Sequence, residues 1–141
     1  METEFFSQNE NETAAIAVKL ATEIESKSLI CLYGDLGAGK SVFARAFIQS
    51  LMPCDTDVPS PTFTLLQTYE SKKTTLYHYD LYRLEYPKEV YELDWENALY
   101  DGITIVEWPS KLGDLLPDRR IDVTLEPINH TTRKIIIHDR T

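Results

Sequence analysis

The chain has 141 residues, 43% of them hydrophobic and 26% charged, which is typical of one soluble globular domain covering residues 1–141. Its 23 acidic residues outnumber its 14 basic ones, the net charge is −9, and no basic cluster is longer than a pair. Since proteins that bind nucleic acid by themselves normally carry a basic surface, this charge balance disfavours direct binding of a polynucleotide.

The sequence also argues against a membrane or secreted protein. No apolar run approaches the about 18 residues that cross a bilayer, and the acidic residues 1–6 differ from a signal peptide. Cys31 and Cys54 show no metal-ligand spacing. We therefore expect two reduced thiols, no cysteine metal site and a cytoplasmic location.

The first half of the chain predicts two helices with a strand between them. Apolar residues recur at helical spacing over residues 12–24, which predicts a helix. The apolar run 29–33 predicts a buried strand, and the apolar stripe over 42–51 predicts a second helix that Pro53 ends. Residues 34–41 therefore connect a strand to a helix.

The second half predicts mostly strands after a proline-rich loop over residues 55–61. Two strands joined by a hairpin turn at residues 71–73 come first, then a helix broken near Asp94, a buried strand ending at Glu107, and a final antiparallel pair. The predicted ranges are 63–70, 74–80, 87–99, 103–106, 121–125 and 135–137.

Residues 34–41 match the P-loop pattern G-x-x-x-x-G-K-[ST] without a gap, as Gly34-Asp35-Leu36-Gly37-Ala38-Gly39-Lys40-Ser41. The glycines let the loop turn its N–H groups toward a phosphate at distances that a Cβ atom would prevent. Lys40 can reach the β- and γ-phosphates, and the Ser41 hydroxyl can bind Mg²⁺. The pattern arises by chance in roughly half a per cent of chains of this length, and its strand–loop–helix setting lowers that chance. The sequence therefore predicts binding of a nucleoside triphosphate.

Two acidic residues end predicted strands, where a P-loop protein normally places the carboxylate of its metal site. Glu107 ends the most apolar strand, and Asp80 ends the strand over residues 74–80. Either could serve the metal, or be a solvated strand end in an acidic chain. The nearby P-loop favours the first interpretation.

Each of four further features can be interpreted in two ways. The segment 60–64 resembles a switch loop whose hydroxyl groups respond to the γ-phosphate, or it is a proline-fixed entry to a strand. His78 is a structural or a catalytic histidine. Arg83 contacts phosphate or pairs with an acid such as Glu85, and Trp108 shields the site or packs in the core. The residues alone favour the structural interpretation of the loop, His78 and Trp108.

Four segments, in this order and at this spacing, resemble the TsaE family, the small bacterial P-loop ATPases of tRNA threonylcarbamoyladenosine (t6A) biosynthesis. They are residues 33–41, Ser60-Pro61-Thr62-Phe63-Thr64-Leu65, His78-Tyr79-Asp80-Leu81-Tyr82-Arg83-Leu84 and Val106-Glu107-Trp108-Pro109. The similarity runs over nearly the whole chain. The family more often has Thr in place of Ser41, but either hydroxyl can bind Mg²⁺. Beyond about Leu116 we match no motif to the family.

The resemblance implies an α/β fold of the P-loop NTPase type, with a mostly parallel central sheet, antiparallel strand additions and flanking helices. It implies ATP and Mg²⁺ as cofactors, with Ser41 and Glu107 on the metal. Lys40, Asp80 and Glu107 would be catalytic, and Asp80 would lie close to the γ-phosphate and position water or a metal-bound water. Residues 10–13 would approach the adenine. The ATP-binding residues would be Gly34, Asp35, Leu36, Gly37, Ala38, Gly39, Lys40, Ser41, Val42, Thr62 and Thr64.

The resemblance also implies two protein partners, TsaB and TsaD. TsaD transfers the threonylcarbamoyl group to an adenosine beside the anticodon, and ATP hydrolysis by TsaE would reset the complex between turnovers. Activity would be weak without the partners. tRNA would be contacted only through them, which agrees with the acidic composition.

Two other functions stay open on the sequence, a small-molecule kinase and a nucleotide-dependent binding switch with low turnover. A kinase normally closes an arginine-bearing lid over the phosphates, and the only adjacent arginine pair here is Arg119-Arg120. GTP is disfavoured as the nucleotide, because the guanine-reading sequence Asn-Lys-x-Asp does not occur.

Overall fold

The computed structural model describes residues 1–53, 56–71 and 74–141. Cys54 and residues 72–73 of the predicted hairpin turn lie outside the described residues. The described chain forms a seven-stranded sheet in the order β1-β7-β6-β2-β5-β4-β3. Its strands are β1 (Glu2–Ser7), β2 (Ser28–Tyr33), β3 (Leu66–Glu70), β4 (Thr75–Asp80), β5 (Ile103–Glu107), β6 (Ile121–Pro127) and β7 (Arg133–Asp139).

The four inner strands of this sheet run parallel. β2 pairs with β5 and β6, and β4 pairs with β5, in each case in the parallel direction. At one side β3 pairs antiparallel with β4, and at the other β7 and β1 continue the sheet in antiparallel pairs. The predicted α/β fold, with a parallel centre and antiparallel additions, is confirmed.

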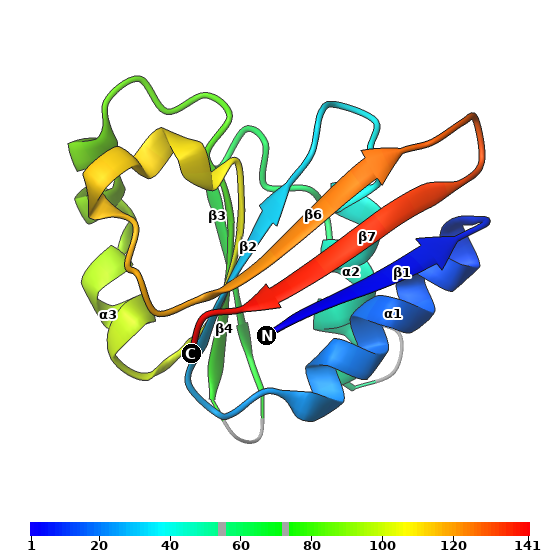
Figure 1. The fold of residues 1–141 in the computed structure, drawn as a ribbon. Coiled ribbons are helices and arrows are strands. Elements are labelled where there is room, and N and C mark those ends of the chain that lie inside the picture. Colours follow the sequence, from blue (N-terminus) through cyan, green and yellow to red (C-terminus); the bar gives the residue numbers. More distant parts are fainter. Residues whose placement is uncertain (54–55, 72–73) are drawn as a thin grey trace.

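Helices cover both faces of the sheet (Figure 1). α1 (Glu10–Glu23) and α2 (Lys40–Leu51) cover one face, where Phe43, Phe47 and Ile30 are fully buried. α3 (Trp95–Asp101) and two 3₁₀ helices, η1 (Pro87–Leu93) and η2 (Pro109–Leu115), cover the other face around Tyr79 and Trp95. This two-sided cover explains why β2 and β5 are continuous apolar runs.

The sequence does not predict β1. This strand pairs with β7 along its length, for example Phe5 with Ile135. Within β1 only Ser7 is buried, so the alternation of apolar and polar residues that marks a half-buried strand is weak. Pairing with β7, rather than a local pattern, places these residues in the sheet.

In two places a turn of the backbone shortens or divides a predicted element. The strand predicted over 63–70 begins only at Leu66, because residues 62–64 form a turn and Leu65 has a φ of 68°. The amide of Leu65 closes this turn by donating to the oxygen of Pro61 at 2.6 Å. The predicted helix over 87–99 divides into η1 and α3 at Asp94, which has a φ of 62°, so the predicted break is confirmed.

Cys31 is a free thiol in the buried part of β2. Burial, aided by the negative charge of Asp122, raises the pKa of Cys31 to about 12. The thiol is therefore protonated and unreactive at neutral pH. Among the helices that the structure describes, none combines the length and apolar character needed to cross a bilayer.

Candidate nucleotide-binding site

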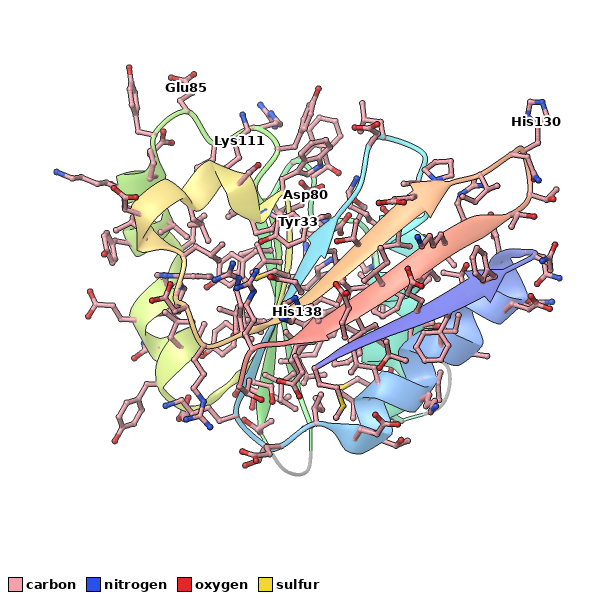
Figure 2. All side chains as sticks on the ribbon, in the orientation of Figure 1. Tyr33, Asp80, Glu85, Lys111, His130 and His138 are labelled. Carbon is pink, nitrogen blue, oxygen red and sulfur yellow. The ribbon has the colours of Figure 1, made fainter. Side chains whose placement is uncertain are left out.

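Three neighbouring parallel strands end at the same edge of the sheet and bring predicted site residues together. β2 leads into the P-loop, and the strand register places Asp80 of β4 opposite Glu107 of β5, which is itself opposite Leu32 of β2. Figure 2 shows Asp80 and Tyr33, the last residue of β2, toward this edge. The carboxyl edge of parallel strands is where open α/β sheets bind their ligands.

A cavity of about 680 Å³ lies along this edge. Ligand sites usually measure about 300–1,000 Å³. Glu10 and Thr13 of α1, in the segment predicted to approach adenine, line the cavity. The other predicted residues in its lining are Leu36, Gly37, Gly39, Lys40, Ser41, Val42, Thr62, Asp80 and Glu107.

The P-loop backbone requires glycine, as Gly34 and Gly39 show. Gly34 has a φ of 151°, and a Cβ atom there would lie 2.8 Å from the oxygen of Leu125 and 3.0 Å from Cβ of Ala38. Gly39 has a φ of 104°, in the left-handed region that favours glycine, directly before α2. The amide of Ala38 donates to the oxygen of Asp35 at 3.0 Å. Gly34, Asp35 and Ala38 thus shape the loop without lining the cavity.

The Lys40 ammonium lies beside this loop, and the residue is only 6% exposed. Its Nζ donates to the oxygen of Gly34 and, at 3.0 Å, to the oxygen of Asp35. The same atom lies 4.3 Å from the centre of the Trp108 ring. Burial lowers the pKa of Lys40 below its ordinary value, and the nearby carboxylates, Glu107 first among them, offset only part of this shift. The loop therefore holds a cation at the place where the P-loop pattern requires one.

Glu107 is held from two sides at the end of β5. Its Oε2 accepts a 2.8 Å hydrogen bond from Nε2 of His78, and its Oε1 accepts a 3.4 Å bond from Oγ of Ser41. Glu107 and His78 are each 3% exposed, so water competes little for this pair. The carboxylate can only accept, so Nε2 carries the bonding proton. His78 therefore orients Glu107, while its Nδ1 is buried without a hydrogen-bond partner in the described part of the chain.

Asp80 is tied to the switch-like loop. Oγ1 of Thr62 donates to its Oδ2 at 2.9 Å, and the Tyr82 amide donates to its Oδ1 at 3.1 Å. The hydroxyl of Ser60 lies 2.7 Å from that of Thr62. Thr64 is exposed and lies outside the cavity lining, and its hydroxyl accepts a 3.1 Å hydrogen bond from the side chain of Gln67. The structure brings Thr62 to the carboxylate but does not bring Thr64 to the cavity.

Ser41 and Glu107 offer the oxygen ligands that Mg²⁺ prefers, and these oxygens are 3.4 Å apart. Among the described residues, no group of three or more His, Cys, Asp or Glu could hold a metal ion. Mg²⁺ in nucleotide sites keeps several waters, binds phosphate oxygens and needs only one or two protein carboxylates. The two side chains therefore fit a metal ion that arrives with a nucleotide.

Two of the open positions lie at the rim of this site. Trp108 has a φ of 61°, lines the cavity, and its ring centre lies 5.0 Å from that of Tyr82. Trp108 therefore covers one side of the Lys40 ammonium. The guanidinium of Arg83 lies 5.4 Å from the ring centre of Phe63, a contact that neither of its two interpretations includes.

Sequence reasoning missed one wall of the cavity. Asn9 and the tail residues His130, Thr131 and Arg133 line it. Figure 2 shows His130 at the tip of the connection between β6 and β7. The tail residues carry no motif and come near the P-loop only because β6 pairs with β2, so no local signal could have found them.

Known proteins resemble this chain in sequence and in fold. The profile of the family described as "Threonylcarbamoyl adenosine biosynthesis protein TsaE" matches residues 7–135. The chain belongs to the TsaE family. The similarity extends over most of this chain and most of each TsaE relative compared with it. The family predicted from the four sequence segments is therefore confirmed.

Two relatives and one solved structure give the extent of this similarity. The "tRNA threonylcarbamoyladenosine biosynthesis protein TsaE" of Rickettsia felis is 43% identical over 125 residues, 89% of this chain and 73% of the relative. The TsaE protein of Bacillus subtilis is 35% identical over 127 residues, 90% of this chain and 79% of the relative. A crystal structure of YdiB from Bacillus subtilis matches with a TM-score of 0.82 and 28% identity, covering 100% of this chain and 87% of that one.

Proposed function

We propose that this chain is a Mg²⁺-dependent ATPase of t6A biosynthesis that acts on a complex of TsaB and TsaD and permits its repeated turnover. The observation that carries the proposal is the convergence of the P-loop, Ser41, Glu107 and Asp80 on one cavity. Membership of the TsaE family adds the pathway. The activity would belong to a single cytoplasmic domain over residues 1–141 and would be weak until the partners bind.

The P-loop and Lys40 would bind the phosphates of ATP. Phosphoryl transfer depends mainly on positioning and on stabilising the charge that spreads over the phosphate oxygens. Lys40 brings a positive charge into a site shielded by Trp108, where water weakens it less. Held by Ser41 and Glu107, a magnesium ion would neutralise charge on the β- and γ-phosphate oxygens.

Asp80 would orient the attacking water. Both of its oxygens already accept hydrogen bonds, from Thr62 and from the Tyr82 amide, and these contacts fix the carboxylate plane. A fixed carboxylate suits positioning, which phosphoryl transfer needs more than a strong base. Since Thr62 belongs to the switch-like loop, a change at the γ-phosphate could move that loop and signal to a partner.

The partners would supply the contact with tRNA. The net charge of −9 leaves this chain poorly suited to bind a polynucleotide by itself. The relatives are named as proteins of t6A biosynthesis, which modifies tRNA. A division of labour in which this chain hydrolyses ATP and its partners hold tRNA satisfies both facts.

The test is ATP hydrolysis with and without TsaB and TsaD, using Lys40→Ala as the inactive control. We expect slow hydrolysis by the chain alone and a clear increase with both partners. No stimulation by the partners would contradict the proposal. Transfer of phosphate to a small metabolite would instead support the kinase, and tight binding of ATP without turnover would support the switch.

A further inference from the structure

The P-loop rests on the last hairpin of the chain, which lies outside the four sequence segments that first indicated the family. A Cβ atom on Gly34 would lie 2.8 Å from the oxygen of Leu125 in β6, and one on Gly39 would lie 3.5 Å from its side chain. Leu125 is 1% exposed. The β6 strand therefore forms the floor on which the loop lies.

The guanidinium of Arg133, the first residue of β7, joins this hairpin to the P-loop. Its Nε donates to the oxygen of Ala38 at 3.2 Å, and its Nη2 donates to the oxygen of Gly37 at 3.4 Å. Its Nη1 donates to the oxygens of Asn129 at 3.0 Å and Thr132 at 3.3 Å. One planar fork thus binds two consecutive loop carbonyls and the hairpin turn, a geometry that a lysine ammonium cannot reproduce.

The hairpin turn that anchors Arg133 is itself held by hydrogen bonds. Oδ1 of Asn129 accepts from the amides of Thr131 at 3.0 Å and Thr132 at 2.9 Å. The amide of Ile128 donates to the oxygen of Thr132 at 2.9 Å. A side chain that is anchored in this way can restrain the loop that it contacts.

The contact with Ala38 also sets the direction of an amide. In a trans peptide the C=O and the following N–H point in opposite directions, and the described residues contain no cis peptide bond. Holding the oxygen of Ala38 toward Arg133 therefore turns the amide of Gly39 away from Arg133. The amide of Ala38 is already bound to Asp35, so the Gly39 amide is the loop N–H group whose direction this contact sets.

We propose that Arg133 is a positioning residue that holds the P-loop in its phosphate-binding conformation through the carbonyls of Gly37 and Ala38. The inference rests on the proposed function, because it assumes that the loop binds the phosphates of ATP. Arg133 also lines the cavity, so its charge could instead act directly on a phosphate. The two roles differ in their response to Arg133→Lys, which keeps the charge and loses the fork.

The test compares Arg133→Lys and Arg133→Gln with Lys134→Met. Lys134 is the next residue, pairs with Glu4 at 2.9 Å and serves as a control for the loss of one positive charge. Loss of the fork removes two hydrogen bonds that restrain the loop, so we expect the Kd for ATP to rise about tenfold in both Arg133 variants. In both Arg133 variants the kcat of the partner-stimulated reaction at saturating ATP should change little. In Lys134→Met both the Kd for ATP and this kcat should stay close to those of the unchanged protein.

Hydrogen exchange in the protein without nucleotide gives a readout that does not depend on ATP. The Ala38 amide, which donates to the oxygen of Asp35 at 3.0 Å, should exchange faster in Arg133→Lys than in the unchanged protein, while core amides of β2 stay protected. Asn129→Ala, which frees the anchor without altering Arg133, should have the same effect to a smaller degree. If either Arg133 variant folds poorly, Asn129→Ala provides the test in its place.

Two results would overturn the inference. If Arg133→Lys binds ATP as tightly as the unchanged protein while Arg133→Gln does not, the charge acts on the phosphate directly. If exchange at Ala38 is the same in all variants, Arg133 does not restrain the loop. Failure of the unchanged protein to bind ATP would refute the proposed function instead, and the exchange result would still decide the role of Arg133.

Discussion

The hydrogen bond between His78 and Glu107 makes the sharpest prediction about catalysis. His78→Phe keeps an aromatic ring at the position but removes the donor that contacts Oε2 of Glu107 at 2.8 Å. Both residues are 3% exposed, so water cannot readily replace the lost donor. The carboxylate would then lose the restraint that directs its other oxygen toward Ser41.

The size of the effect follows from the chemistry of this contact. A hydrogen bond to a charged group contributes about 1.5–3 kcal/mol, and the loss of a partner that orients a metal ligand typically costs about 10- to 100-fold in metal affinity or activity. We therefore expect His78→Phe to raise the Mg²⁺ concentration for half-maximal ATPase activity by about 10- to 100-fold. His78→Gln, which can again donate to the carboxylate, should recover part of the loss.

The assay is a Mg²⁺ titration of the partner-stimulated ATPase, together with binding of ATP in the absence of Mg²⁺. His138→Gln is the matched control, because His138 is partly exposed and lies 4.0 Å from Glu2 in another part of the sheet. An unchanged Mg²⁺ dependence in His78→Phe would refute the view that His78 orients Glu107. Equal loss of ATP binding without Mg²⁺ would refute it as well, since the effect would then be general damage to the site.

Three other predictions follow from the site and its surroundings. Lys40→Ala should abolish ATP binding in a titration, whereas Glu107→Ala should leave binding and remove Mg²⁺-dependent hydrolysis; normal hydrolysis by Glu107→Ala would contradict the metal assignment. Gly34→Ala should lower the free energy of unfolding by about 1–3 kcal/mol in denaturant titrations, because the new Cβ meets the Leu125 carbonyl; an unchanged midpoint would show that the loop shifts without cost. The raised pKa of Cys31, about 12 against 9.0, means that the unfolded state releases its proton first as the pH rises. Stability should therefore fall from about pH 9 to pH 12, and Cys31→Ala should flatten this part of the curve; an equal slope in both proteins would refute the assignment.

The local sequence was enough for the parts of the site that lie in continuous segments. The P-loop is defined by eight consecutive residues, and the apolar runs on either side of it show a strand and a helix. Asp80 and Glu107 could be placed at strand ends for the same reason. Their roles in catalysis stay predictions, because position at a strand end does not show which group a side chain contacts.

At two places the local sequence pattern did not predict the structure. The residues of β1 lack a clear alternation and become a strand through pairing with β7. The Leu65 turn shortens the predicted strand and leaves Thr64 outside the cavity lining, although its neighbour Thr62 reaches Asp80. Long-range pairing decided the structure of β1, and a single backbone dihedral, the φ of Leu65, decided where the strand after it begins.

The sequence by itself determined that this protein carries a P-loop between a buried strand and a helix, because that motif depends only on neighbours along the chain. The tertiary structure decided which side chains complete it. The sheet register puts Asp80 directly opposite Glu107, and the buried interior then brings His78 against the same carboxylate. Arg133 meets Ala38 across 95 positions of sequence. Such contacts arise from strand order and packing, which no local window of the sequence contains.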